Sequence, residues 1–179
     1  MASAQSSFAQ TLERGLLGES EIAKWLMSRG GTILPAYQIE IDEGKGPRVF
    51  RAHGNLVAPD MLTINSGKDV AWIEAKTKGG WTWFRGAKSW QDGIDKNHWL
   101  DYVQVDQELP WPVHILFLHK ERKGAKDSPQ DKIPPSAGLY GNSVNRLADC
   151  IDHTSDKHGN HGMVYWNRSA LKRYSGYPL

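Results

Sequence analysis

The sequence predicts an α/β protein in which helices flank a central mixed β-sheet. Three observations indicate this class. An amphipathic helix pattern stands near the N-terminus, four strand patterns with turn residues between them follow, and a further helix pattern precedes a strongly apolar strand. The order helix, three or four strands, helix, strand is typical of α/β domains with a mixed sheet. A length of 179 residues suits a single domain.

The composition excludes several classes of protein. Apolar residues make up 39% and charged residues 23%, as in ordinary globular proteins, and no apolar run approaches the ~20 residues of a membrane span. We therefore expect no membrane partner. The single cysteine, Cys150, excludes an intrachain disulfide, and the N-terminus lacks a signal-peptide core, so a cytoplasmic location is expected. The net charge of +2 does not decide for or against nucleic acid, because binding depends on where the charges lie.

A first helix is predicted over residues 8–29, and Gly30 and Gly31 end it. At 100° per residue, one face of this helix is an apolar stripe. The stripe consists of Phe8, Leu12, Leu16, Ala23, Leu26 and Met27. Glu19 falls in the middle of the stripe, whereas Glu21 falls on the opposite side. A carboxylate on a core-facing stripe needs a partner, so Glu19 is a candidate functional residue and Glu21 an ordinary solvated one.

Four strand patterns follow the first helix. Residues 32–41 and 48–55 are moderate patterns, separated by a turn at residues 42–47. Residues 56–64 and 69–77 are stronger, and the sequence NSGK between them is a credible hairpin loop.

The second half of the chain begins with a helix predicted over residues 87–105, although Gly93 weakens its middle. Residues 111–119 then read as a buried strand, because apolar residues occupy both of its faces. Residues 120–136 are charged and proline-bearing and are predicted to form a loop. The remaining residues, 137–179, are predicted to form a C-terminal α/β extension with a helix near 143–151, a strand at 162–166 and a short final helix.

Charged residues interrupt the two stronger strand patterns. Side chains alternate along a strand, so Trp72, Glu74 and Lys76 share one face, which begins apolar and ends charged. On the preceding strand, Asp60 lies among apolar neighbours, where an unpaired carboxylate is costly. Across a hairpin, its partner would be Lys76 or a metal ion shared with Glu74. The alternative is a structural ion pair between Asp60 and Lys76 with Glu74 pointing outward, although such pairs add little net stability.

Three carboxylates and one lysine thus need partners inside one small domain: Glu19, Asp60, Glu74 and Lys76. A cluster of like charges is strongly unfavourable unless a cation neutralises it. Carboxylate oxygens without thiols or imidazoles suit Mg²⁺ or Mn²⁺ and not zinc. The sequence therefore predicts a site for a hard metal ion.

This pattern resembles the PD-(D/E)XK nuclease superfamily, which has the restriction-endonuclease-like fold. The matching residues are Pro59-Asp60 and Glu74-Ala75-Lys76, with Glu19 in a helix before the strands. The segment GESEIAKWLMSRG looks like the opening helix of Holliday-junction-resolvase-like members, and WQDGIDKNHWLDYVQV is similar to the helix that follows the Glu-X-Lys strand. The resemblance covers roughly residues 12–118. It implies a core of order α-β-β-β-α-β at about residues 8–119 of a single nuclease-like domain.

The resemblance also implies a role for each matching residue. Asp60, Glu74 and the Ala75 carbonyl would ligate Mg²⁺ or Mn²⁺, and Glu19 would complete the shell directly or through water. Lys76 would orient the attacking water and stabilise charge on the phosphate oxygens. The expected activity is hydrolysis of DNA phosphodiester bonds by an endonuclease, and a homodimer is left open. A catalytically inactive module of the same fold that binds DNA or a protein is the alternative.

Cations and aromatic rings alternate directly after Lys76. Five residues are expected to contact nucleic acid: Lys78, Trp81, Arg85, Lys88 and Gln91. The cations would meet phosphates, and Trp81 would stack on bases, unless its ring packs beneath the second helix. Gln91 shares one side of that helix with His98 and Tyr102, where a polar residue could touch nucleic acid or satisfy core hydrogen bonds.

A rival metal site is offered by four residues near the C-terminus: Cys150, His153, His158 and His161. They are plausible zinc ligands, but their spacing matches no zinc module. Glycine-rich polar loops often collect histidines without binding a metal.

Overall fold

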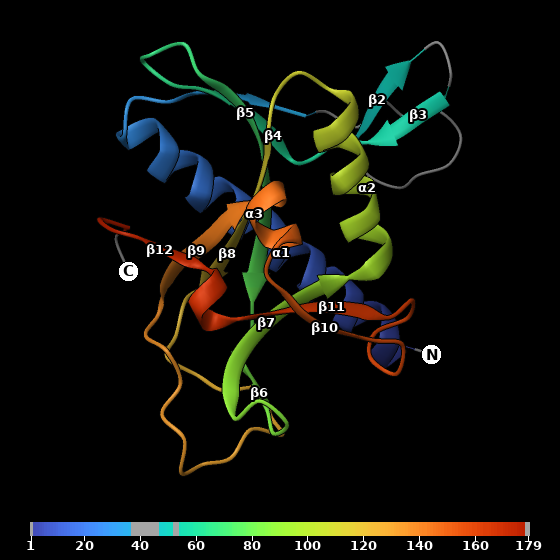
Figure 1. Cartoon of the computed structure of the whole chain (residues 1–179), viewed down its shortest axis with the longest axis vertical. Helices are drawn as coiled ribbons and strands as arrows, with labels where there is room; N and C mark the ends of the chain where they lie inside the picture. Colours follow the sequence, from blue (N-terminus) through green and yellow to red (C-terminus); the bar gives the residue numbers. More distant parts are fainter. Residues whose placement is uncertain (1, 37–46, 52–53, 178–179) are drawn as a thin grey trace.

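A computed structural model describes residues 2–36, 47–51 and 54–177 of the chain (Figure 1). Its centre is a six-stranded sheet of order β1-β4-β5-β8-β9-β12. The strands are β1 (Thr32–Pro35), β4 (Met61–Ile64), β5 (Val70–Lys78), β8 (Val113–His119), β9 (Gly138–Ser143) and β12 (Lys172–Tyr174). β5 and β8 pair in parallel and the other neighbours pair antiparallel, so the sheet is mixed, as predicted.

Two helices cover opposite faces of this sheet, α1 (Ala2–Ser28) and α2 (Lys96–Glu108). α1 packs through Ile22 on the face that carries Ile73 of β5, and α2 packs through Tyr102 and its neighbours on the face that carries Ile115 of β8. The elements α1, β1, β4, β5, α2 and β8 follow one another in the predicted order α-β-β-β-α-β. Within the described residues, no helix is both long enough and apolar enough to cross a membrane.

A short hairpin, β2 (Arg48–Arg51) and β3 (Gly54–Val57), is inserted between β1 and β4 and forms a two-stranded sheet of its own. The strand predicted at residues 48–55 therefore splits into this hairpin. The strand predicted at residues 32–41 is observed as β1, and its last five residues lie outside the described part of the chain.

A second sheet has the order β10-β11-β7-β6 and is antiparallel throughout. Its strands are β6 (Thr82–Phe84), β7 (Ser89–Asp95), β10 (Ile151–Ser155) and β11 (Met163–Asn167). β7 shows that the helix predicted over residues 87–105 is wrong in its first half. Gly93 explains the difference, because a Cβ there would lie 2.6 Å from the carbonyl oxygen of Val164 on β11. The helix starts only after Asp95, whose side chain accepts a hydrogen bond from the Asn97 N–H at 2.9 Å.

The C-terminal residues, expected as an α/β extension, contribute to both sheets. β9 and β12 widen the central sheet, whereas β10 pairs with β11 and β11 pairs with β7. The predicted helix near residues 143–151 is shorter, α3 (Val144–Ala148), and the final helix is a single 3₁₀ turn, η1 (Arg168–Ala170). Residues 120–136 form the expected loop between β8 and β9.

The contact between α1 and the sheet differs from the predicted apolar stripe. Leu16 and Met27 are 57% and 51% exposed, Ala23 and Leu26 pack against the core as predicted, and the side chains of Phe8 and Leu12 lie outside the described part of the structure. The most deeply buried face of the helix carries Gly18, Ile22 and Trp25, which follow the i, i+4, i+7 spacing. A Cβ at Gly18 would lie 1.7 Å from the Thr77 hydroxyl oxygen on β5. Because Gly18 has no side chain, the helix backbone lies directly against β5.

Gly18→Ala is expected to destabilise the protein by about 1–3 kcal/mol, because the added methyl group overlaps Thr77. Gly15→Ala is the matched control one turn earlier, where a Cβ would meet only a Glu19 carboxylate oxygen at 4.0 Å. The control should stabilise the helix by roughly 0.5–1 kcal/mol. Urea unfolding measures both values. Equal stabilisation by the two substitutions would contradict the close approach of α1 to β5.

Candidate active site

Asp60 and Glu74 lie side by side where β4 begins. The register pairs Met61 with Ile73, and continuing it by one residue brings Asp60 opposite Glu74 on the same sheet face. The Asp60 carboxylate accepts a hydrogen bond from the Ala75 N–H at 2.8 Å. Glu74 is only 2% exposed. The two carboxylates are thus neighbours at the edge of the core, beneath α2.

Lys76 completes the charged end of β5. Its ammonium group forms an ion pair with Glu74 and donates a hydrogen bond to the Tyr102 hydroxyl of α2 at 3.4 Å. The Lys76 side chain is 26% exposed, so its ammonium lies at the boundary between the core and the solvent. The alternative of an Asp60–Lys76 pair with Glu74 pointing outward is therefore wrong, because Glu74 is buried and is itself the partner of the lysine.

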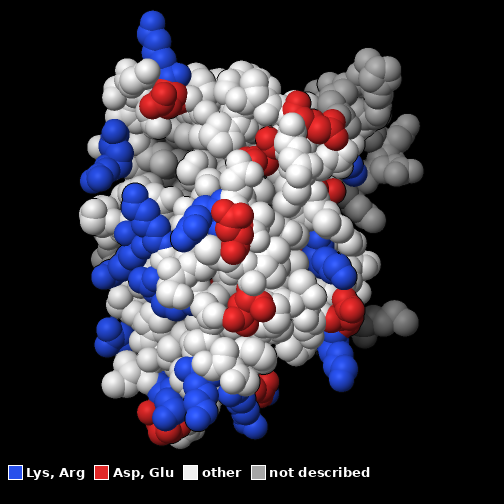
Figure 2. Space-filling model, in the orientation of Figure 1, with Lys and Arg blue, Asp and Glu red and all other residues white. Residues whose placement is uncertain are grey.

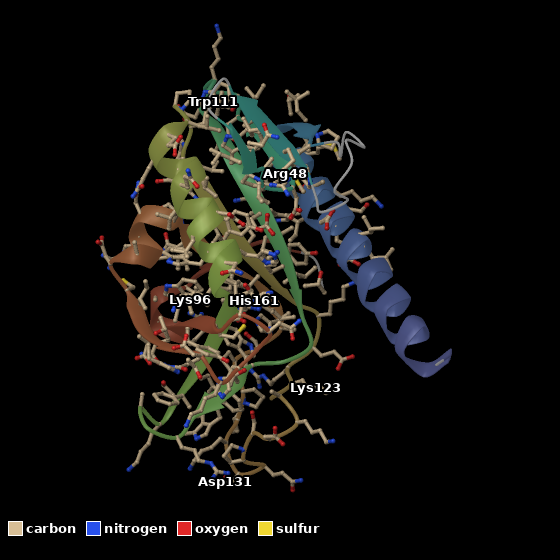
Figure 3. All side chains as sticks on the ribbon, turned by 90° about the vertical axis from the view of Figure 1, so that its right-hand side faces the viewer. Arg48, Lys96, Trp111, Lys123, Asp131 and His161 are labelled. Carbon is tan, nitrogen blue, oxygen red and sulfur yellow. The ribbon has the colours of Figure 1, made fainter. Side chains whose placement is uncertain are left out.

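Glu19 reaches this group from α1. The contact of Gly18 with Thr77 places the next residue of the helix beside the end of β5. Burial raises the pKa of Glu19, the charge of Glu74 raises it further, and Lys76 opposes the shift. The structure therefore brings together the four residues that the sequence singled out: Glu19 from α1, Glu74 and Lys76 from β5, and Asp60 from a bend just before β4 and not from within a strand as predicted. Figure 3 shows α1 and α2 on the two sides of β5, with Arg48 of β2 between them.

The negative charge of this group exceeds what one lysine can balance. Burial, followed by the charge of Glu74, raises the pKa of Asp60 to about 8, despite the opposing effects of Lys76 and the Ala75 hydrogen bond. For Lys76, burial disfavours the charged form, but Glu74, Asp60 and Glu19 outweigh it and raise the pKa of the ammonium. A further cation at this position would relieve the repulsion among the carboxylates.

The donor groups fit a Mg²⁺ ion that is held by two carboxylates and several waters better than one that three carboxylates ligate directly. No three His, Cys, Asp or Glu side chains of the described residues are grouped so as to hold a metal ion, so direct ligation by Glu19, Asp60 and Glu74 together does not fit. Asp60 and Glu74 offer two adjacent carboxylates. The N–H and C=O of a strand residue point to the same edge, so the Ala75 carbonyl faces the edge where Asp60 lies. Mg²⁺ usually takes one or two carboxylates and keeps several waters, which these groups permit.

Two of the five residues expected to contact nucleic acid are buried. Trp81 has no exposed surface and stacks on His119 with ring centroids 4.0 Å apart, so the expectation that it stacks on bases is wrong. Gln91 lies in β7 instead of the helix, and its amide donates hydrogen bonds to Asp152 at 2.7 Å and Asn167 at 3.1 Å. The buried Gln91 amide therefore has its hydrogen bonds satisfied within the protein, which is the alternative to a contact with nucleic acid.

The three expected cations differ in their surroundings. Arg85 and Lys88 are exposed in the turn between β6 and β7. Lys78 is half-buried and forms an ion pair with Asp92 at 3.1 Å. On the face drawn in Figure 2, Lys and Arg side chains gather along the left and lower edges, and the lower edge is formed by β6 and the loop of residues 120–136.

The rival metal ligands are not grouped together. His153 stacks on Phe84 and Tyr165, with ring centroids 4.2 and 4.8 Å away, and its Nδ1 lies 2.8 Å from the Asp152 carboxylate. His158 hydrogen-bonds to the Tyr165 hydroxyl at 2.8 Å. Cys150 and His161 belong to no metal-holding group in the part of the chain that the structure describes.

Sequence reasoning missed a second buried polar group, formed by Asp92 and His119. The helix predicted over residues 87–105 includes Asp92. In the structure, Asp92 lies in β7 and its carboxylate contacts His119 of β8. The available signal was His119, a titratable residue at the end of an otherwise apolar buried strand.

Comparison with solved structures finds similar chains. The chain is similar to Hjc, a Holliday junction resolvase from the archaeal hyperthermophile Archaeoglobus fulgidus, with a TM-score of 0.48 and 10% sequence identity, over 87% of this chain and 90% of the resolvase. That resolvase is of the kind that the sequence resemblance named. No protein-family model matches the chain, and no curated protein matches it. The functional proposal rests on the geometry of the carboxylates and the lysine.

Asp60→Asn is expected to stabilise the protein at pH 8 in EDTA by a few kcal/mol, since each unit of pKa shift corresponds to about 1.4 kcal/mol. The folded-state pKa of about 8 lies above the unfolded value, so wild-type stability is full below about pH 4 and is lost as the pH rises to about 8. Asparagine avoids that loss and keeps an acceptor for the Ala75 N–H.

Urea unfolding at pH 4, 6 and 8 measures this difference, which should grow with pH. Asp127→Asn, in the exposed loop, is the control and should change little. A large loss of stability for Asp60→Asn at every pH would instead make Asp60 a structural residue.

Proposed function

We propose that this protein is an endonuclease that hydrolyses phosphodiester bonds of DNA with Mg²⁺ or Mn²⁺. The observation that carries the proposal is the buried contact of Asp60, Glu74 and Lys76, where the start of β4 lies against the middle of β5. A structural core gains little from such a group, because buried like charges are costly. Water activation next to a phosphate needs these groups together.

The carboxylates of Asp60 and Glu74 and the Ala75 carbonyl would hold the divalent ion, and Glu19 would act through water. When bound there, the ion lowers the pKa of water and polarises a phosphate oxygen. Glu19 is half-buried beside the group, and burial raises its pKa above the usual value, which favours a part in proton transfer.

Lys76 would act on the phosphate. An ammonium group has three donors, and two of them are directed to Glu74 and Tyr102, so one is left for a phosphate oxygen or a water molecule. Burial and then the charge of Glu74 raise the pKa of Tyr102, so its hydroxyl stays protonated and neutral beside the lysine. Tyr102 thereby orients the Lys76 ammonium without competing for its charge.

DNA is proposed as the substrate on the basis of the sequence motif. The resemblance of Pro59-Asp60 and Glu74-Ala75-Lys76 to the PD-(D/E)XK superfamily supports a nuclease, and Arg85 and Lys88, which are exposed, would meet phosphates.

Lys76→Ala is expected to lower the rate of DNA cleavage by about 10²–10³-fold, because one charged donor to the transition state is lost. The assay uses supercoiled, linear, single-stranded and four-way-junction DNA with Mg²⁺, Mn²⁺ or EDTA. Glu74→Gln should abolish metal-dependent cleavage. Lys120→Met is the matched control, because Lys120 is also paired with a glutamate, Glu21, but at an exposed site.

Each outcome of this assay decides between the two candidate classes. Metal-dependent cleavage that Lys76→Ala loses and Lys120→Met keeps supports the nuclease. Binding of DNA with no cleavage of any substrate would overturn the nuclease in favour of an inactive binding module. Equal cleavage by wild type and Lys76→Ala would place the activity elsewhere.

A further inference from the structure

A second buried polar cluster lies next to the candidate active site and shares strand β5 with it, through Lys78. Asp92 of β7 is 5% exposed at its side chain, and its carboxylate lies 3.1 Å from the Lys78 ammonium of β5 and 2.8 Å from His119 Nε2 of β8. Lys78 also donates a hydrogen bond to the Gly93 carbonyl. The fully buried His119 stacks in parallel on the fully buried Trp81, with ring planes 2° apart. Three strands and two stacked rings thus fix one lysine.

Stability alone does not account for this cluster. Burial opposes the charge of Asp92, and Lys78 and His119 outweigh it to hold the pKa of that carboxyl below its usual value. Replacing a buried ion pair by apolar residues is often neutral or stabilising. His119 Nδ1 and Trp81 Nε1 are buried without a hydrogen-bond partner among the described residues, which adds a further cost. An arrangement this costly is better explained by the position that it gives to Lys78.

Lys76 and Lys78 form a matched pair on β5. They lie two residues apart in the strand, so their side chains project from the same face and their Cα atoms are about 7 Å apart. Each ammonium directs two donors to protein acceptors and has one left. The lysine side chains are 26% and 19% exposed, whereas their carboxylate partners Glu74 and Asp92 are 2% and 5% exposed. Both lysines therefore lie at the solvent boundary with their partners behind them.

We infer that Lys78 binds the backbone phosphate next to the one that is cleaved, and that Asp92 and His119 are positioning residues for its ammonium. Two cations on one face of a strand can contact two phosphates of the same nucleic-acid strand, because that strand carries a negative charge at every nucleotide. The inference rests on the proposed function, because it takes the phosphate beside Lys76 as the reacting one. It assigns Trp81 a supporting role, as the ring on which His119 rests.

The test measures DNA binding and not cleavage, so that the inference and the nuclease proposal can fail separately. Fluorescence anisotropy in EDTA gives the Kd of labelled DNA for wild type and Lys78→Met at several salt concentrations. Lys78→Met should weaken binding about tenfold and lower the slope of log K against log salt by about 0.7–0.9, the value for one phosphate contact. Lys120→Met should leave Kd and slope unchanged, because Lys120 lies on the other face of the sheet.

A double-mutant cycle tests the positioning role. Asp92→Asn keeps the charge of Lys78 but releases its ammonium, so it should weaken binding in the wild-type background and have no further effect in Lys78→Met. A purely structural role would give the same loss in both backgrounds. Thermal unfolding verifies that each variant is folded at the assay temperature. His119→Gln replaces Asp92→Asn in the cycle if the latter does not fold.

The outcomes are distinct. Loss of affinity and slope in Lys78→Met, with non-additivity in the cycle, supports the inference whether or not the protein cleaves DNA. Unchanged affinity and slope in Lys78→Met overturn it and leave the cleavage assay unaffected. Additive effects of Asp92→Asn and Lys78→Met overturn the positioning role. A wild-type protein that binds no DNA overturns both the inference and the proposed function.

Discussion

The repulsion among three carboxylates near the middle of β5 constrains every element around them. Glu19 comes from α1, Asp60 from the bend before β4 and Glu74 from β5, and among the described residues Lys76 is the cation that opposes their charge. Holding like charges together requires that each element be fixed by contacts elsewhere. Gly18 lets α1 lie against β5, the β4–β5 register aligns the two strand carboxylates, and Tyr102 of α2 directs the lysine.

The second sheet supports the same strand from another side. β7 carries Asp92 to Lys78 and then leads directly into α2, so one segment supplies both a partner for Lys78 and, through Tyr102, a partner for Lys76. β11 packs against Gly93 and fixes this segment as a strand. The C-terminal residues are therefore part of the scaffold of the site, since β11 and β10 hold β7 in place.

Much of the site could be predicted from the sequence, because it depends on local periodicity. Alternation along a strand places Glu74 and Lys76 on one face, and an apolar context marks Asp60 as needing a partner. What could not be predicted depends on contacts between distant segments. The close approach at Gly18 rotates α1 away from the expected stripe, and the packing of Trp81 on His119 joins β8 to a segment that resembled an exposed surface. The sequence of β7 predicts a helix, because the requirement for a glycine at position 93 becomes visible only when β7 pairs with β11.

We propose that Asp60 and its neighbours form a site whose excess negative charge is neutralised by one divalent cation. Calorimetric titration of Mn²⁺ in two buffers with different heats of ionisation tests it most directly. With its pKa raised to about 8, Asp60 is mostly protonated at pH 7 and must lose its proton when it becomes a ligand. We expect one bound Mn²⁺ per chain, release of about one proton at pH 7 and little at pH 9, and loss of binding in Asp60→Asn. Binding at pH 7 without proton release, or binding that Asp60→Asn leaves unchanged, would contradict it.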